Sequence, residues 1–420
     1  MRHSRKGGGG ARRGGPGANK SAAQRQERKR PPHARGPKPA HGPKPTHAPR
    51  PAHHQKPTAP VESRIDANKL SQALSASAPL RAGEWLWTTR EGAERDLIEE
   101  LLWLRDDAIR PRLLGPALVA SAKAPQLRDG RLDLTFARQG FQVTHVAHCA
   151  GEADTSRELA AALAPELRNA IGATDQHALQ VFVADSTQGN TLSARAQALR
   201  DILDRECPQT LDETQLRRHG GLLVQACLLD AQTAALGCIP SQQAQSLWPG
   251  GRARMRLGGD FPSRAARKLA EAFAWLGVAP GSGELCVDLG AAPGGWSWLL
   301  LEKRARVIAV DPARMDAKLM RNPRLNHVQG NAFVYEPEEP VDWLFCDMAY
   351  RPLEVAAMLG RWARRRHTRL LVANFKLPMK RKVEMVERIR GLLADSGFMS
   401  LRTRQLYHDR EEITLTAHAR

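Results

Sequence analysis

A glycine-rich turn between an apolar strand and a helix constrains this chain more than any other feature of its sequence. The apolar run 284–289 predicts a short buried strand, and 297–302 predicts the first turns of a helix. Between them lies Gly290-Ala-Ala-Pro-Gly-Gly-Trp296. Such an element binds nucleotides, because glycines let a ligand approach the backbone and the helix N-terminus offers unpaired N–H groups. The sequence therefore predicts an α/β domain with a mostly parallel, Rossmann-like sheet.

The glycine spacing differs from that of dinucleotide-binding folds. The pattern is G-x-x-x-G-G, and Ala292 stands where the second glycine of the G-x-G-x-x-G fingerprint approaches pyrophosphate. A second predicted strand, 306–311, ends in Asp311, 21 residues after Gly290, where an acid can bind ribose hydroxyls. The wider turn suits an adenosine with a short cationic amino-acid tail. The turn alone leaves open a tight β–α connection that binds no ligand.

Charged residues follow at the ends of the next predicted elements. An amphipathic helix over 262–273 contains Lys268, and two later apolar strands end in Asp347 and Lys376. Open α/β sheets bind ligands at the carboxyl ends of their strands, so the two strand-end residues are expected at one edge.

The last alternating segment, 405–415, predicts a closing strand and contains the adjacent acids Glu411 and Glu412. Neighbouring residues of a strand point to opposite faces, and the register against Ile413 favours Glu412. Each charged residue has an ordinary alternative as a solvated side chain or a helix cap. The occurrence of four such charged residues on successive predicted elements argues against coincidence.

These segments resemble the FtsJ type of ribose-2′-O-methyltransferase, which carries a Lys-Asp-Lys-Glu tetrad. Two stretches are more closely similar to the family of bacterial large-subunit ribosomal RNA methyltransferase M: Asn374-Phe-Lys-Leu-Pro-Met-Lys380 and Gln405-Leu-Tyr-His-Asp-Arg-Glu-Glu412. The resemblance is strong from about 255 to 418, weaker from about 84 to 254, and absent over 1–60. It implies S-adenosyl-L-methionine as cofactor and 2′-O-methylation of a cytidine ribose in 23S rRNA. The rRNA partner would be naked or in an early assembly intermediate.

The resemblance also implies residue roles. It assigns Lys376 as proton acceptor, together with Lys268, Asp347 and Glu412. A lysine accepts a proton only in its neutral form, which desolvation or a neighbouring cation favours. In an alternative that remains open, Lys376 only orients the hydroxyl. The implied cofactor-binding residues are Ser263, Asp288, Gly290, Ala292, Pro293, Gly294, Gly295, Trp296, Asp311, Asn331 and Asp347.

One position departs from the family pattern. Asn331 stands where the family usually has an acid near the adenine. An amide oxygen can still accept a hydrogen bond from the adenine amino group, so cofactor binding is expected to survive.

Charge is concentrated at the N-terminus. Residues 1–60 hold 15 Lys and Arg and one acid, so +14 of the formal net charge of +19 lies there. Three proline-rich hexapeptides, beginning at Gly36, Gly42 and Ala48, oppose a helix. We expect a disordered basic Pro/Gly/His-rich tail that gains affinity for RNA by counterion release, with a plain solubilising linker as the alternative.

The remaining chain predicts a linker over 61–83, an α+β region over 84–250 and the methyltransferase domain over 251–420. Strands are expected over 84–89, 178–184 and 222–229, with helices over 94–103 and 191–205. By collinearity with the family, 84–250 resembles its THUMP-type RNA-binding part; an unassigned α/β domain is the alternative.

Several classes of site and function are disfavoured. The six cysteines are scattered without a C-x-x-C pair, which favours reduced thiols in the cytoplasm and no metal site. No apolar run reaches the ~18 residues of a membrane span. We expect a monomer. The rivals are methylation of another RNA site, a non-catalytic ribosome-assembly factor on the same scaffold and, more distantly, a nicotinamide dehydrogenase. The sequence Cys346-Asp-Met-Ala349 lacks the Asn/Asp-Pro-Pro motif of base methylases, which favours a ribose.

Overall fold

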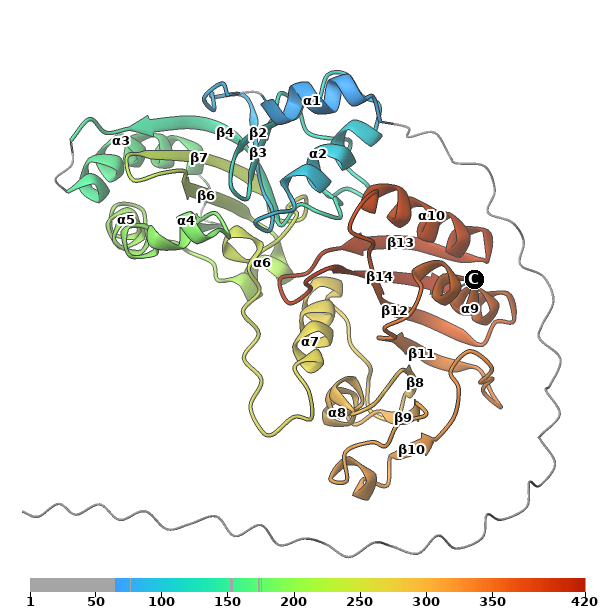
Figure 1. Cartoon of the computed structure of the whole chain (residues 1–420). Helices are drawn as coiled ribbons and strands as arrows, with labels where there is room; N and C mark the ends of the chain where they lie inside the picture. The colour runs from blue at the N-terminus through green and yellow to red at the C-terminus, as the bar shows by residue number, and fades with distance from the viewer. Residues whose placement is uncertain (1–64, 76, 152–153, 173, 175, 420) are drawn as a thin grey trace, which may run out of the picture. The chain divides into compact units, whose positions relative to one another are not determined.

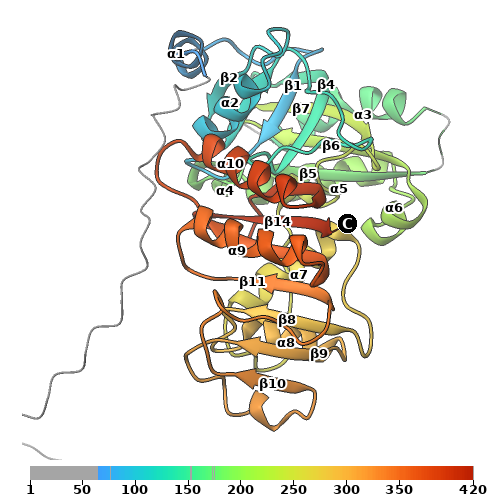
Figure 2. The same ribbon diagram turned by 90° about the vertical axis from the view of Figure 1, so that its right-hand side faces the viewer.

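Two seven-stranded sheets organise the chain in the computed structural model (Figures 1 and 2). The structure describes residues 65–75, 77–151, 154–172, 174 and 176–419, so the predicted basic tail lies outside the described residues. Within that part of the chain, no helix is long and apolar enough to cross a membrane.

The first sheet is mostly antiparallel, with strand order β2-β3-β1-β4-β7-β6-β5, and only β5 and β6 pair in parallel. Its strands are β1 (Trp85–Thr88), β2 (Arg112–Gly115), β3 (Leu118–Ser121), β4 (Gln139–His148), β5 (His177–Val183), β6 (Leu222–Leu228) and β7 (Thr233–Pro240). Its helices are α2 (Glu94–Trp103), α3 (Thr155–Ile171), α4 (Thr187–Thr191), α5 (Ser193–Glu206) and α6 (Glu213–His219). The predicted α+β character of this region is confirmed.

The segment 61–83, predicted to be a linker, contains helix α1 (Ala67–Ser75). The helix contacts α2 and β2. Lys69 forms an ion pair of 2.6 Å with Asp107, beyond the end of α2. The domain boundaries at 83 and 250 stay predictions.

The second sheet is parallel except at one side, with strand order β10-β9-β8-β11-β12-β14-β13. Only β14 runs against its neighbours β12 and β13. The strands are β8 (Leu285–Leu289), β9 (Arg306–Val310), β10 (Leu325–Val328), β11 (Val341–Cys346), β12 (Thr368–Lys376), β13 (Phe398–Arg404) and β14 (Glu412–Ala419). The helices are α7 (Ala265–Leu276), α8 (Gly295–Glu302), α9 (Pro352–Arg364) and α10 (Lys382–Asp395). This Rossmann-like sheet confirms the predicted α/β class.

Helices cover both faces of the second sheet. On one face, α7 and α8 pack through residues such as Phe273 and Leu300 onto Phe345 of β11. On the other, α9 and α10 bury Leu359 and Ile389 against the sheet. The strands are therefore buried on both sides, which explains their nearly continuous apolar sequences.

One predicted strand is shorter than expected. The alternation over 405–415 predicts a single strand, but 405–411 forms a loop and β14 begins at Glu412. Side chains satisfy this loop's backbone: Asp409 accepts the Leu406 N–H, and Glu271 of α7 accepts the N–H groups of Tyr407 and His408. These side-chain acceptors take the place of the backbone hydrogen bonds of a strand. Glu271 comes near the loop only in the folded protein.

The contact between Gly140 and Trp87 gives a stability prediction. A Cβ on Gly140 would lie 2.2 Å from Cε3 of the fully buried Trp87, whose Nε1 donates to Ser121 Oγ over 2.8 Å. Gly140→Ala should therefore destabilise the protein by about 1–3 kcal/mol through overpacking. Gly391→Ala is the matched control: Gly391 lies inside α10 with nothing within 4 Å of an added Cβ. It should raise stability by about 0.5–1 kcal/mol. Chemical denaturation of each variant measures both changes, and equal midpoints would contradict the packing argument.

Candidate active site

The candidate site lies where the parallel strands of the second sheet end. Strands β8, β9, β11 and β12 share one direction, so their carboxyl ends meet at one edge. The antiparallel β14 begins at that edge, and its first residue, Glu412, is paired in register with Lys376, the last residue of β12. The sheet topology alone therefore brings two of the four predicted tetrad residues together.

Helix α7 adds Lys268 to this edge. Its Nζ forms an ion pair with Glu412 Oε2 and lies 4.0 Å from Asp347 Oδ1. The three side chains are 16–22% exposed, so the ion pairs are largely shielded from water. Glu411 instead contacts Arg90 and Lys382, at 3.1 Å and 3.3 Å. The contacts thus bring Glu412, rather than Glu411, to Lys268.

The buried charged groups shift one another's pKa values. Burial raises the pKa of Asp347 to about 6, although Lys268 opposes the rise. For Lys268, burial favours the neutral form, but Asp347 and Glu412 outweigh it and raise its pKa. Lys268 therefore remains a cation within this cluster.

Lys376 differs from the other three residues. It is exposed, and within the described residues no carboxylate lies within 4.0 Å of its Nζ. The ion pairs of Asp347 and Glu412 both go to Lys268. The amine of Lys376 is consequently left accessible to a substrate.

Two buried polar residues that the sequence did not single out support Asp347. Asn374 Nδ2 donates to Asp347 Oδ1 over 3.2 Å, and Thr414 Oγ1 donates to Asn374 Oδ1 over 2.8 Å. Asn374 and Thr414 are paired in register on β12 and β14, two residues from the pair formed by Lys376 and Glu412. Each lies two positions from a predicted tetrad residue on the same strand and therefore on the same face of the sheet. This spacing is the one sequence signal that could have identified Asn374 and Thr414.

Asp409 and Glu271 hold the loop that precedes Glu412. Asp409 is buried, burial raises its pKa well above the usual value, and its Oδ2 lies 3.0 Å from Thr414 Oγ1. Glu271 accepts two backbone N–H groups of the loop and lies 2.7 Å from His408 Nδ1. Because α7 carries both Glu271 and Lys268, it positions Glu412 from two sides.

The glycines of the turn lack a Cβ atom that would clash with neighbouring residues of the protein. Gly290 has φ +78°, and an added Cβ would lie 2.7 Å from Met348 Cγ; Gly294 has φ +118°, and its Cβ would lie 2.3 Å from Leu319 Cδ1. A Cβ on Gly295 would lie 2.2 Å from Ser263 Oγ. The turn is therefore pressed against the loops beside it. Ser263, predicted to bind the cofactor, touches the start of α8.

Asp311 and Asp288 hold the turn from two sides. Asp311 Oδ2 accepts the Ala292 N–H over 3.1 Å, and its Oδ1 accepts the Ala313 N–H over 2.7 Å. Asp288 is fully buried, and its Oδ2 accepts a 2.7 Å hydrogen bond from Ser297 Oγ. Among the described residues, none forms a hydrogen bond with its Oδ1. Burial raises the pKa of Asp288 to about 7.

The remaining predicted cofactor residues are placed differently from one another. Pro293 is exposed at the turn. The Trp296 side chain is buried, and its Nε1 donates to Ala265 O over 3.0 Å, so its ring joins α8 to α7. Asn331 is exposed, but its Oδ1 already accepts the Phe333 N–H over 2.9 Å. Its amide N–H groups are the more accessible donors.

An open pocket lies beside Lys376. Lys376, Tyr350, Arg351, Pro378 and neighbouring residues line it. Tyr350 is 47% exposed, and its ring packs edge-on against Phe333 with centroids 4.9 Å apart. The pocket therefore offers an aromatic face next to an accessible amine, a combination that the sequence did not indicate.

This chain is similar to several known proteins. Residues 261–381 match the family of FtsJ-like methyltransferases. Ribosomal RNA large subunit methyltransferase M of Alkalilimnicola ehrlichii is 34% identical over 361 residues, covering 80% of this chain and 94% of that protein. The protein of the same name from Laribacter hongkongensis is 32% identical over 349 residues, covering 79% and 95%. Among solved structures, magnesium protoporphyrin IX methyltransferase from Synechocystis with bound S-adenosylmethionine is 20% identical with a TM-score of 0.29, covering 37% of this chain and 80% of that one.

The buried Asp288 generates a pH prediction. Its pKa of about 7 in the fold exceeds the ~3.9 of an unfolded aspartate, so the native state binds more protons over this interval. Stability without ligand should therefore fall as pH rises from about 4 to about 7. Asp288→Asn should flatten this part of the dependence. Ser297→Ala, the companion variant, removes the hydrogen bond that lowers the pKa of Asp288 and should steepen it. Denaturation midpoints at pH 5 and pH 8 test both; an unchanged slope in Asp288→Asn would contradict the prediction.

Proposed function

The chain belongs to the family of ribosomal RNA large subunit methyltransferase M, and on that premise we propose that it methylates the 2′-oxygen of a cytidine ribose in 23S rRNA. It is an S-adenosylmethionine-dependent rRNA methyltransferase. The observation that carries the ribose assignment is the exposed amine of Lys376 beside the Lys268, Asp347 and Glu412 cluster. We expect the chain to act as a cytoplasmic monomer on naked rRNA or an early assembly intermediate.

The residues around the turn fit the cofactor. Asp311 is the acid that would hold the ribose, and Asn331 lies on the loop after β10 that would meet the adenine. Asp288, whose buried Oδ1 has no partner in the part of the chain that the structure describes, and Asp347 are acids beside the turn, where they would favour a cationic ligand. When bound, S-adenosylmethionine supplies an electrophilic methyl group on a sulfonium.

The protein's own residues would orient the acceptor and move its proton. A ribose hydroxyl holds its proton tightly, so it needs a neighbouring base or a group that directs its lone pair. Lys376 is the accessible candidate at the sheet edge. Asp347 and Glu412 keep Lys268 in place.

Tyr350 would support the nucleotide whose ribose faces Lys376. It lines the same pocket, is 47% exposed and is braced by Phe333. RNA-binding proteins hold unstacked bases on such aromatic side chains. We therefore assign Tyr350 to base stacking, either with the target base or with its neighbour in the strand.

The region 84–250 is proposed as the THUMP-type RNA-binding part, and 1–60 as a basic extension that adds affinity. Deleting 1–60 would then weaken the salt dependence of rRNA binding without changing single-turnover methyl transfer.

Lys376 provides the central test. Lys376→Ala should retain binding of S-adenosylhomocysteine and rRNA while single-turnover methylation falls by about 10²–10⁴-fold, the range of general acid–base catalysis. Lys376→Arg should not restore the rate, because a guanidinium stays protonated. Lys380→Ala is the matched control, since Lys380 is exposed in the same loop and does not line the pocket. Nucleotide-resolution mapping of ribose methylation in 23S rRNA provides the readout. A wild-type rate in Lys376→Ala, or methylation of a base, would refute the assignment.

Tyr350 provides an independent test on the acceptor side. Tyr350→Ala should raise KM for rRNA by roughly five- to 150-fold, because stacking contributes about 1–3 kcal/mol per base. Tyr350→Phe keeps the ring and should stay near wild type. Val334→Ala serves as control, since Val334 is 75% exposed and lies outside the pocket. Steady-state kinetics with titrated rRNA separate KM from kcat. Equal KM values for the alanine and phenylalanine variants would exclude stacking.

A further inference from the structure

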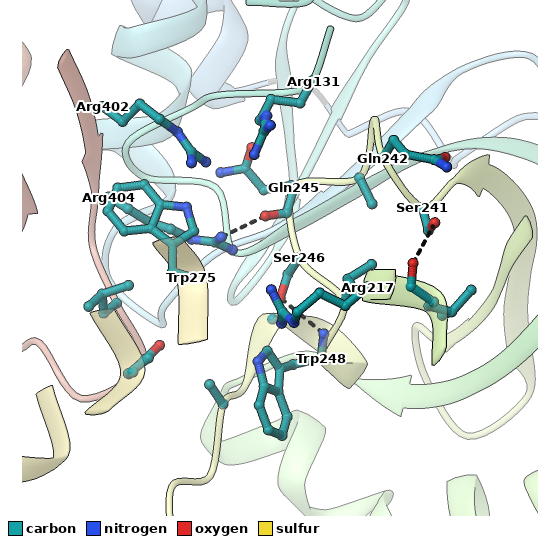
Figure 3. A pocket seen from close by; sticks show the side chains of 17 residues that line it. Arg131, Arg217, Ser241, Gln242, Gln245, Ser246, Trp248, Trp275, Arg402 and Arg404 are labelled. Carbon is teal, nitrogen blue, oxygen red and sulfur yellow. Dashed lines mark hydrogen bonds between the residues drawn. The ribbon is translucent and has the colours of Figure 1, made fainter. Parts of the chain in front are cut away.

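A second cavity lies between the two sheets, on the side of helix α7 (Figure 3). Residues from both regions line it, including Arg131, Arg217, Trp248, Trp275, Arg402 and Arg404. In Figure 3 the guanidinium groups of Arg131 and Arg402 approach one another at one side, while Arg217 lies beside Trp248. The predicted tetrad and turn contribute none of the lining residues.

Four arginines and one acid, Glu271, line the cavity, so cationic groups outnumber the acid. Arg402 lies 3.5 Å from Asp133, and Arg217 lies 2.9 Å from Glu213. Arg404 donates to two neutral carbonyl oxygens, those of Gln245 and Arg138, at 2.6 Å and 2.7 Å. Arg131 is exposed and has no carboxylate within 4.0 Å among the residues that the structure describes.

The arginines also disfavour one another's charge. Burial lowers the pKa of Arg404 to about 10, and Arg402 lowers it further although Glu271 opposes them. Burial likewise lowers the pKa of Arg402, and Arg131 adds to this effect although Asp133 opposes it. An anion placed among these guanidinium groups would relieve that repulsion.

Planar side chains line the cavity together with the charged groups. The Arg402 guanidinium lies 4.6 Å from the centre of the Trp275 ring, and the half-buried Trp248 lines the cavity as well. A phosphate beside arginines and a base against indole or guanidinium planes are the contacts that proteins make with single-stranded RNA. The lining thus matches a nucleotide in both its charged and its aromatic part.

The cavity lies on the same face of the second sheet as the tetrad. Asn374, Thr414 and Arg404 are paired in one row across β12, β14 and β13. Opposite residues in an antiparallel pair share a face, and two strand spacings amount to about 10 Å. A similar separation lies along helix α7, because Lys268 near the tetrad and Trp275 at the cavity are seven positions apart, which corresponds to a rise of about 10 Å. A strand of RNA that contacts both places would have to span roughly this distance.

We propose that this cavity binds a nucleotide of the substrate rRNA other than the methylated one, with its phosphate on Arg131 and Arg217 and its base against Trp248 or Trp275. The inference rests on the proposed function, since it takes rRNA as the ligand. Its consequence is that the enzyme holds the acceptor strand at two points, one beside Lys376 and one between the two sheets.

The test compares two exposed arginines of the same short helix. Arg217 lines the cavity, whereas its neighbour Arg218 is exposed and does not. The full chain carrying Arg131→Gln and Arg217→Gln is titrated with unmodified 23S rRNA over a range of salt concentrations. For single strands the slope of log K against log salt should fall by about 0.7, because the double variant loses its contact with one phosphate. Arg218→Gln should leave the slope unchanged. S-adenosylhomocysteine affinity should equal that of the wild type in every variant.

Slopes that are equal in the double variant and in Arg218→Gln would overturn the proposal. Crosslinking of wild-type protein to 4-thiouridine-substituted rRNA gives a second readout without any substitution. Crosslinked peptides that contain Trp248 or Trp275 support the site, and crosslinks confined to other peptides contradict it. Failure of the proposed function is distinguishable, because a base-methylated product would refute ribose methylation while the slopes and crosslinks still decide the cavity.

Discussion

The half-buried ammonium of Lys268 is the interaction on which the active edge depends. It joins helix α7 to Asp347 after β11 and to Glu412 at the start of β14. A buried ion pair that loses one partner leaves an uncompensated charge, which costs about 3–5 kcal/mol. Lys268, Asp347 and Glu412 are therefore tied to one another even before any catalytic role is considered. They fix where the ends of three separate elements meet.

This arrangement gives the two lysines different surroundings. Both acids pair with Lys268, while Lys376 stays exposed at the end of the neighbouring strand. Behind Asp347, Asn374 donates to its Oδ1, and Thr414 and Asp409 continue this chain of buried polar contacts. A rigid cation and an accessible amine result from four charges that look equivalent in the sequence.

The two sheets are joined by buried contacts as well as by the chain. Lys382 of α10 pairs with Asp96 of α2 at 2.8 Å, and Thr135 and Thr403 share a 2.8 Å hydrogen bond. Arg404 donates to the backbone of Gln245 and Arg138. The arginine-lined cavity lies beside these contacts, so its lining residues depend on both regions being folded. An RNA strand held there would be bound by the region that precedes the methyltransferase fold and by that fold together.

Local patterns in the sequence determined the elements and several of the site residues. Alternation and helical spacing depend only on neighbours in the chain, so they predicted β8, α8, β11 and β12 with small shifts at their ends. The same alternation selected Glu412 over Glu411, and the strand ends predicted Asp347 and Lys376 at one edge, which the topology confirms.

Only the tertiary structure decided what those residues touch. Glu271 reaches Tyr407 across 136 positions and Asn374 reaches Thr414 across 40, distances over which no local pattern acts. For the same reason Trp296, predicted beside the cofactor, turns its ring into the core, and 405–411 becomes a loop held by side chains. The sequence by itself determined which charged residues stand at the ends of elements. Packing of elements far apart in the chain decided which of these residues are paired, which are buried and which remain accessible, because hydrogen bonding and desolvation depend on neighbours in space.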